Sequence, residues 1–162
     1  CGLFGASCRR ISSLIARTPT PAELSPVVFF DTNILLYLLS ADDTKAGAAE
    51  RTLAQGGCIS VQVLNELTNV CRRKLDMPWE RLHAWLNGLL PLLEPVRGLD
   101  TETHRIACAV AQRHQIGFYD SLIVAAALQA GCETLYSEDM HHGLRVRDGA
   151  ARVRVVNPFL SA

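Results

Sequence analysis

Short hydrophobic runs alternate along the chain with longer segments in which hydrophobic residues recur every three or four positions. The runs predict five strands, at residues 27–30, 58–61, 92–96, 134–137 and 152–156. The longer segments predict helices over residues 32–39, 43–57, 61–74, 77–90, 100–114 and 120–131. Because strands alternate with helices, we expect βαβ crossovers and an α/β fold whose mainly parallel sheet is covered on both faces.

Several helix starts carry a capping residue. Asp31 or Thr32 can cap the first helix, Asp43 or Thr44 the second, and Asp100 or Thr101 the fifth. Asp120 stands at the start of the last helix, where an aspartate is ordinarily a simple N-cap. Taken alone, Asp120 would therefore be interpreted as a cap, whereas the apolar residues on both sides of Asp31 make capping a weaker explanation there.

The length of 162 residues predicts a single domain, which we place at residues 26–162. Residues 1–25 show no hydrophobic period, the chain begins at Cys1, and its first methionine is Met77. We expect this N-terminal extension to be disordered or to reflect a mis-set start.

The overall charge and the cysteines narrow the classes of function. The formal net charge is zero, so binding to nucleic acid would need a local basic patch. No apolar run is long enough to span a membrane. The six cysteines form no C-x-x-C pair, which argues against a zinc knuckle. We expect reduced, mostly buried thiols in a cytoplasmic protein rather than a disulfide framework.

One hydrophobic stretch, "VVFFDTNILLYLL" at residues 27–39, is interrupted by an acid, Asp31. A buried carboxylate is costly unless a partner compensates it. Three further acids fall near the ends of predicted strands or the starts of the helices beside them: Glu66, Asp120 and Asp139. In open α/β sheets the functional crevice lies outside the carboxyl ends of the strands, so we expect these acids to meet there.

Clustered carboxylates repel one another, and a divalent cation removes that conflict. Oxygen ligands suit Mg²⁺ or Mn²⁺, and such a site supports metal-assisted hydrolysis of a phosphodiester. Thr32 and Asn33 can hydrogen-bond the carboxylates or a metal-bound water. Of the adjacent acids Glu138 and Asp139, we expect Glu138 to face solvent and Asp139 to turn inward.

Four segments carry a resemblance to a known family: "FFDTNILLYLL", "SVQVLNEL", "FYDSLIVAAAL" and "LYSEDMHHG". Together they resemble, in order, the four acidic motifs of the PIN domain family, and most closely its VapC-type toxins of type II toxin–antitoxin pairs. The resemblance covers the chain from about residue 27 to the C-terminal tail.

The resemblance implies a Rossmann-like α/β/α sandwich with a five-stranded sheet in the order 3-2-1-4-5. It also implies a magnesium- or manganese-dependent endoribonuclease. By motif position, Asp31, Glu66, Asp120 and Asp139 would be the catalytic, metal-binding acids, and Asn33 and Ser137 would support them. Similar proteins form homodimers, cleave RNA, and are held inactive by a cognate antitoxin whose tail enters the acidic groove.

Basic residues and histidines lie near the acids in the sequence. Arg72, Arg73 and Lys74 follow the helix that carries Glu66 and could contact RNA phosphates, although such a charge run is usually a solvated face. His141 and His142 follow Asp139 and could contact metal or substrate, although histidine beside a turn is more often a surface residue.

Two other functions remain as alternatives. A magnesium-dependent phosphatase of the haloacid-dehalogenase type also places an aspartate at the end of its first strand. It needs a second aspartate two residues later, where this chain has Asn33. The other alternative is a non-catalytic PIN scaffold that binds RNA or a protein partner.

Overall fold

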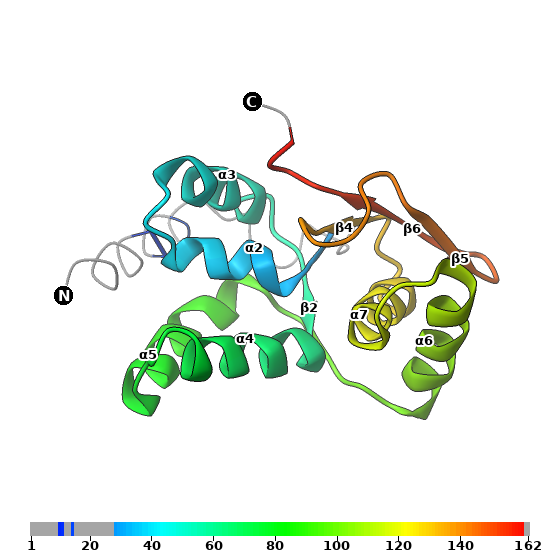
Figure 1. Ribbon diagram of the computed structural model, residues 1–162, viewed down its shortest axis with the longest axis horizontal. Helices are drawn as coiled ribbons and strands as arrows, with labels where there is room; N and C mark the ends of the chain where they lie inside the picture. Colours follow the sequence, from blue (N-terminus) through cyan, green and yellow to red (C-terminus); the bar gives the residue numbers. More distant parts are fainter. Residues whose placement is uncertain (1–9, 12–13, 15–27, 161–162) are drawn as a thin grey trace.

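The computed structural model describes Arg10, Ile11, Leu14 and residues 28–160. Its strands are β1 (Val28–Phe30), β2 (Ile59–Ser60), β3 (Val96–Arg97), β4 (Thr134–Tyr136), β5 (Arg145–Asp148) and β6 (Ala151–Val156). Its α-helices are α2 (Thr32–Leu36), α3 (Asp43–Leu53), α4 (Val61–Arg73), α5 (Trp79–Leu89), α6 (Thr101–His114) and α7 (Phe118–Gln129), and two 3₁₀ turns are η1 (Tyr37–Leu39) and η2 (Leu90–Leu92). Figure 1 shows α6 and α7 together on one side of β4, β5 and β6.

The strands are mainly parallel. One sheet has the order β1-β4-β6-β5 and a second pairs β2 with β3. A parallel bridge between Phe29 and Cys58 joins the two, with Cys58 accepting from Phe30 at 3.0 Å and donating to Val28 at 3.1 Å. Across this bridge the order is β3, β2, β1, β4, β6, so the predicted α/β class and the predicted neighbours of each strand are confirmed.

The predicted strand count was wrong by one. β5 is an additional strand, antiparallel to β6 and joined to it at Asp148 and Ala151 by a tight turn. The hydrophobicity pattern does not predict β5, because only Val146 of its four residues is apolar and buried. The third strand was also misplaced: β3 begins at Val96, while Leu90–Leu92 forms η2.

The helix caps agree only in part with the predictions. Asp31 and Asp100 cap α2 and α6 through side-chain hydrogen bonds, as expected. The cap of α3 is Asp42, one residue before the predicted one. Asp120 is not a cap, because Gly117 precedes α7 and Asp120 lies within its first turn. Its carboxylate is therefore not explained by capping.

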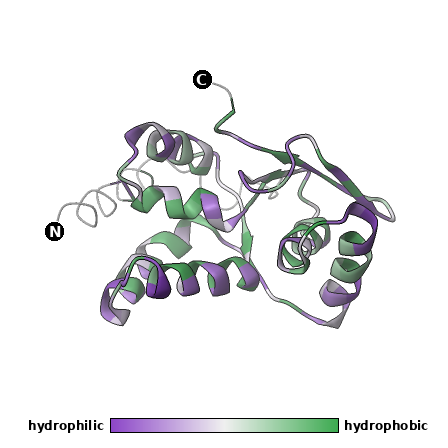
Figure 2. Cartoon of the chain, in the orientation of Figure 1, coloured by the Kyte–Doolittle hydropathy of each residue, from purple (hydrophilic) through white to green (hydrophobic). Residues whose placement is uncertain are grey.

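The core is centred on α7, which is buried over all of residues 121–128 and packs against α6, β5 and β6. Figure 2 shows a different pattern for α4, in which hydrophobic and hydrophilic residues alternate along the helix. Its buried face carries Val63, Leu67 and Cys71, which leaves the intervening positions for polar residues. This amphipathic helix presents Glu66 beside Thr32, at the start of α2.

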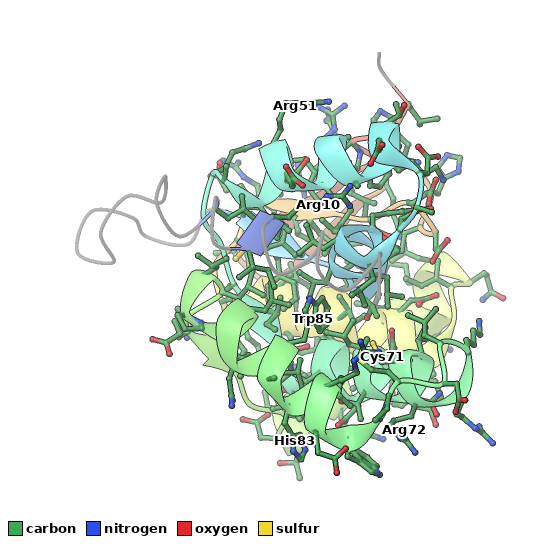
Figure 3. The ribbon with its side chains drawn as sticks, turned by 90° about the vertical axis from the view of Figure 1, so that its left-hand side faces the viewer. Arg10, Arg51, Cys71, Arg72, His83 and Trp85 are labelled. Atoms are coloured by element: carbon green, nitrogen blue, oxygen red, sulfur yellow. The ribbon has the colours of Figure 1, made fainter. Side chains whose placement is uncertain are left out.

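The described residues before β1 pack on the domain. Ile11 and Leu14 are each 4% exposed and join the hydrophobic core. Arg10 pairs with Asp43 at 2.7 Å and with Glu50 at 3.0 Å, both on α3. Figure 3 shows Arg10 and the buried Trp85 between α3 and α5. The rest of the predicted extension lies outside the described residues.

The four described cysteines are free thiols, and Cys58, Cys71 and Cys132 are buried. Their burial agrees with the expectation of mostly buried cysteines; Cys1 and Cys8 lie outside the described residues. Within the part of the chain that the structure describes, no helix has the length and hydrophobicity needed to cross a membrane.

Candidate functional site

Asp31 lies at the point where β1 ends and α2 begins. Its backbone N–H donates to the carbonyl of Tyr136 at 3.0 Å, which continues the pairing of β1 with β4 by one residue. Its side chain then accepts from the backbone N–H of Thr32 at 2.6 Å and caps α2. The residue is only 4% exposed, so the sheet carries this carboxylate into the interior.

Two polar side chains complete the surroundings of the Asp31 carboxylate. The Ser137 hydroxyl donates to Asp31 Oδ2 at 2.6 Å, and the Asn33 amide donates to the same oxygen at 2.9 Å. Ser137 is fully buried and follows β4, so its position is fixed by the β1–β4 pairing. Three donors therefore hold one buried carboxylate in a single orientation.

Asn33 also connects Asp31 to the loop that carries Asp139. Its amide N–H₂ donates to Asp139 Oδ2 at 3.2 Å, and its carbonyl oxygen accepts from the Glu138 backbone N–H at 3.1 Å. Asn33 is 9% exposed, so these contacts are largely shielded from water. An aspartate here could not donate to either carboxylate, which explains why the residue two positions after Asp31 is an amide.

Glu66 faces Asp31 from α4. Thr32 Oγ1 donates to one carboxylate oxygen of Glu66 at 2.8 Å, and Gln62 Nε2 donates to the other at 2.8 Å. Gln62 was not singled out from the sequence, although its spacing of four residues from Glu66 places both on one face of the helix.

Asp120 reaches the site from the first turn of α7. The glycine before this helix leaves room for it, because a Cβ at Gly117 would lie 3.0 Å from Asp120 Oδ2. Next to it, Phe118 and Tyr119 are 37% and 65% exposed. Neither Gly117 nor these aromatics were identified from the sequence.

The pKa shifts show that the four acids share one electrostatic environment. Burial raises the pKa of Asp31 to about 7, against the opposing hydrogen bonds from Ser137 and Thr32, and the charges of Glu66 and Asp120 raise it further. Burial likewise raises the pKa of Asp120, with added contributions from Glu66 and Asp139. The predicted acids therefore come together at one edge of the sheet.

These carboxylates suit a hard divalent cation. All the converging groups offer oxygen, the donor atom that Mg²⁺ and Mn²⁺ prefer. A cation would offset the burial and the neighbouring negative charges that raise both pKa values. Among the described residues, no three acidic, histidine or cysteine side chains lie close enough together to hold a metal ion as a group.

The expectation for Glu138 was wrong. Its carboxylate is only 25% exposed, accepts from Lys45 Nζ at 2.7 Å, and also receives the Tyr37 hydroxyl. The Lys45 ammonium holds the pKa of Glu138 below its ordinary value in spite of partial burial. Asp139 is the more exposed residue of the two, although it does face the site through Asn33. The Glu138 anchor thus fixes the loop that presents Asp139.

The basic residues and histidines named from the sequence behave differently from one another. The Arg72 guanidinium donates to the carbonyl of Met77 and lies 4.8 Å from the centre of the Trp79 ring, so it is engaged at the end of its own helix. Arg73 and Lys74 are exposed. His142 Nδ1 accepts a hydrogen bond from the Asn157 backbone N–H at 3.0 Å, so this histidine contacts the segment that follows β6. His141 is exposed.

Comparison with known proteins adds to this geometry. A family model described as "PIN domain" matches residues 28–144, a range that contains all four acids. Sequence comparison with curated proteins gives no match.

Three solved structures are similar in fold. A toxin–antitoxin complex from Klebsiella pneumoniae matches with 19% identity and a TM-score of 0.55, over 69% of this chain and 86% of that one. VapBC2 from Rickettsia felis, bound to a DNA fragment of its promoter, matches with 22% identity and a TM-score of 0.52, over 69% and 86%. VapC20 of Mycobacterium tuberculosis, a toxin that cleaves the sarcin–ricin loop, matches with 23% identity and a TM-score of 0.56, over 69% and 89%.

Proposed function

Because the chain belongs to the PIN domain family, we propose that it is a divalent-cation-dependent endoribonuclease of the VapC type. In this proposal it hydrolyses phosphodiester bonds of RNA, and Asp31, Glu66, Asp120 and Asp139 hold Mg²⁺ or Mn²⁺. A bound cation of this kind supplies an activated water and polarises the phosphoryl oxygens.

The single observation that carries the proposal is the convergence of carboxylates on a buried one. Asp31 is 4% exposed and has its pKa raised to about 7 by burial and by two neighbouring acids. A fold that served only as a scaffold would gain stability from an amide or an apolar side chain at this position. A cation bound at this position would compensate the charge of Asp31 and its neighbours.

The polar side chains of the site orient the acids. The hydroxyls of Thr32 and Ser137 both donate to carboxylates, at 2.8 Å and 2.6 Å, so each is engaged in positioning rather than free to act as a nucleophile. Asn33 ties Asp31 to Asp139 and so links the end of β1 to the end of β4. The proposed reaction therefore needs no covalent intermediate on the protein.

The similar structures support a proposal for the partner and the cellular setting. Two of them are toxin–antitoxin complexes and the third is a toxin that cleaves the sarcin–ricin loop. We extend this to a cognate antitoxin that blocks the acidic site, a homodimeric toxin, and action on RNA in the cytoplasm. Arg73 and Lys74, which are exposed at the end of the Glu66 helix, are the proposed RNA contacts of this edge.

The test is incubation of the purified chain, free of any antitoxin, with total cellular RNA in Mg²⁺, in Mn²⁺ and in EDTA. We expect discrete fragments that require a cation and disappear in Asp120→Asn. Asp76→Asn is the matched control, because it makes the same chemical change at an exposed position.

Cleavage that persists in EDTA, or in Asp120→Asn, would contradict the proposed site. RNA binding without cleavage under any of these conditions would favour the non-catalytic scaffold.

A further inference from the structure

The hairpin formed by β5 and β6 carries four arginines on one face. The cross-strand pairs are Arg145 with Arg154 and Arg147 with Arg152, and between them Val146 pairs with Val153. The two valines are 1% and 2% exposed and point into the core. Because side chains alternate along a strand, the arginines point together to the opposite side, where all are exposed. We call this surface the arginine face: Arg145, Arg147, Arg152 and Arg154.

This arrangement is unfavourable for the fold alone. Like charges placed directly opposite across two strands destabilise the pairing. Among the described residues, the arginine face makes one ion pair, between Arg152 and Glu133 at 3.7 Å, and both of those side chains are well exposed. The formal net charge of the whole chain is zero, so this is a local concentration of positive charge and not a general property. We interpret this local concentration of positive charge as a sign of an anionic ligand.

A hollow on the hairpin fits such a ligand. It has a volume of about 250 Å³ and is lined by the four arginines, the two valines and Glu133. Arginine presents a planar fork of donors that matches phosphate oxygens, and a single strand of RNA carries one phosphate at every nucleotide, so one strand can contact several of these arginines. The hairpin also lies beyond residue 144, where the match to the family model ends.

We propose that the arginine face is a second binding surface for RNA, which holds the phosphate backbone of the substrate at a distance from the acidic site. This rests on the proposed function, and it answers a problem that the site creates. Four clustered carboxylates repel a polyanion, so a basic surface elsewhere on the chain is needed to retain the substrate. Phosphate contacts of this kind position RNA without reading its sequence.

The topology places the two surfaces within reach of one strand of RNA. β6 runs parallel to β4, and Val156 pairs with Tyr136, the residue just before Ser137. Arg154 lies two residues earlier on β6, which is about 7 Å along the strand. Arg154 pairs with Thr134, so its side chain lies on the same face of the sheet as that of Tyr136. The Tyr136 hydroxyl on this face donates to Gln55, which follows α3. RNA leaving the acidic edge can therefore continue over the arginine face.

The experiment compares two charge-matched double variants of the full chain. Arg145→Gln with Arg154→Gln removes the cross-strand pair nearest the site, and Arg51→Gln with Arg113→Gln removes the same charge from exposed positions on α3 and α6. Binding of a fluorescein-labelled single-stranded RNA is followed by anisotropy in EDTA over a range of salt concentrations. Poly-glutamate is the second probe, and cleavage of a short RNA that fills only the acidic site is measured in Mn²⁺.

We expect the hairpin variant to lower the slope of log K against log salt by about 1.4, since each lost phosphate contact contributes about 0.7 for a single strand. Binding of the long RNA should weaken, cleavage of the short RNA should stay unchanged, and the control variant should behave as wild type. An unchanged slope, or equally strong arginine-dependent binding of poly-glutamate, would overturn the proposal.

Failure of this inference is distinguishable from failure of the proposed function. If wild type cleaves RNA but the salt slope does not depend on the hairpin, the arginine face is not an RNA surface and the nuclease proposal stands. If no RNA is cleaved but the slope falls in the hairpin variant, the arginine face binds RNA and the nuclease proposal fails.

Discussion

Replacing Asp31 with asparagine removes a buried negative charge while nearly preserving the shape of the side chain. The metal-free protein must accommodate that charge at 4% exposure, with two other acids nearby. We therefore expect Asp31→Asn to make the metal-free protein more stable at alkaline pH and, at the same time, to abolish RNA cleavage.

The magnitude follows from the pKa of Asp31. Burial raises it to about 7 from an ordinary value of 3.8, so the folded state binds the proton more tightly than the unfolded state. Protonated Asp31 contributes its full stabilisation below pH 3.8. This contribution falls as the pH rises toward about 7 and is absent above that pH. A shift of about three pKa units corresponds to about 4 kcal/mol between those limits.

Part of this gain is lost again in the variant. The amide of asparagine can still accept from Thr32 and donate to Ser137, but the Asn33 amide then loses its acceptor at 2.9 Å. Such a loss costs about 1 kcal/mol. We expect a net stabilisation of about 2 to 3 kcal/mol at pH 8, which is about 5–10 °C in Tm for a domain of this size. Near pH 4 the difference should vanish or reverse.

The assay is thermal and urea unfolding of wild type and Asp31→Asn in EDTA at pH 8 and near pH 4, followed by the same melts in Mg²⁺. Added Mg²⁺ should raise the Tm of wild type, because a ligand that binds only the folded state stabilises it, and should leave the variant unchanged. Asp76→Asn serves as the exposed control. A variant that is no more stable than wild type at pH 8, or a difference independent of pH, would refute the reasoning.

Four further outcomes follow from the same structure. Asn33→Ala should lower the rate of RNA cleavage by at least about tenfold and the free energy of unfolding by about 1–3 kcal/mol, because Asp31, Asp139 and the backbone N–H of Glu138 lose their hydrogen-bond partner. Cleavage kinetics and urea unfolding measure the two effects, and an unchanged rate would contradict the bridging role of Asn33. In calorimetry, the affinity for Mn²⁺ should rise with pH by up to about tenfold per pH unit below pH 7, because protons bound to Asp31 and Asp120 compete with the ion. An affinity that does not change with pH would exclude these acids as ligands. Trp85→Ala should destabilise the chain by about 3–5 kcal/mol in urea, as the residue is 1% exposed. Arg147→Gln should instead stabilise it by about 0.2–1 kcal/mol through relief of cross-strand repulsion, and a loss of stability would mean that the arginines support the hairpin.

The sequence predicted the parts of the fold that depend on hydrophobic period. α4 and α6 have a clear polar and apolar face, and α7 is apolar over residues 122–128, so their residues identify them. Asp31 could be recognised because it interrupts an apolar run, and its burial follows directly from that run. The parallel order of strands then brings acids that are distant in sequence to one edge.

Features that depend on strand pairing or on tertiary contacts could not be predicted from the pattern of hydrophobic residues. β5 has one buried apolar residue, and only the Asp148–Gly149 turn marks it. Its register with β6 was therefore missed, and with it the contribution of Arg145 and Arg147 to the arginine face. Glu138 looked like a surface acid because its partners, Tyr37 and Lys45, are brought to it by tertiary packing. The space at Gly117 that accommodates the Asp120 carboxylate is likewise a property of backbone geometry.

The most direct test of the central claim compares two titrations of one preparation with Mn²⁺. Calorimetry reports binding of the ion, and the initial rate of RNA cleavage reports activity. We predict that both curves have the same midpoint and that both responses are lost in Asp120→Asn but kept in Asp76→Asn. Cleavage that proceeds before the site fills, or that survives Asp120→Asn, would contradict a ribonuclease whose cation is held by these four carboxylates.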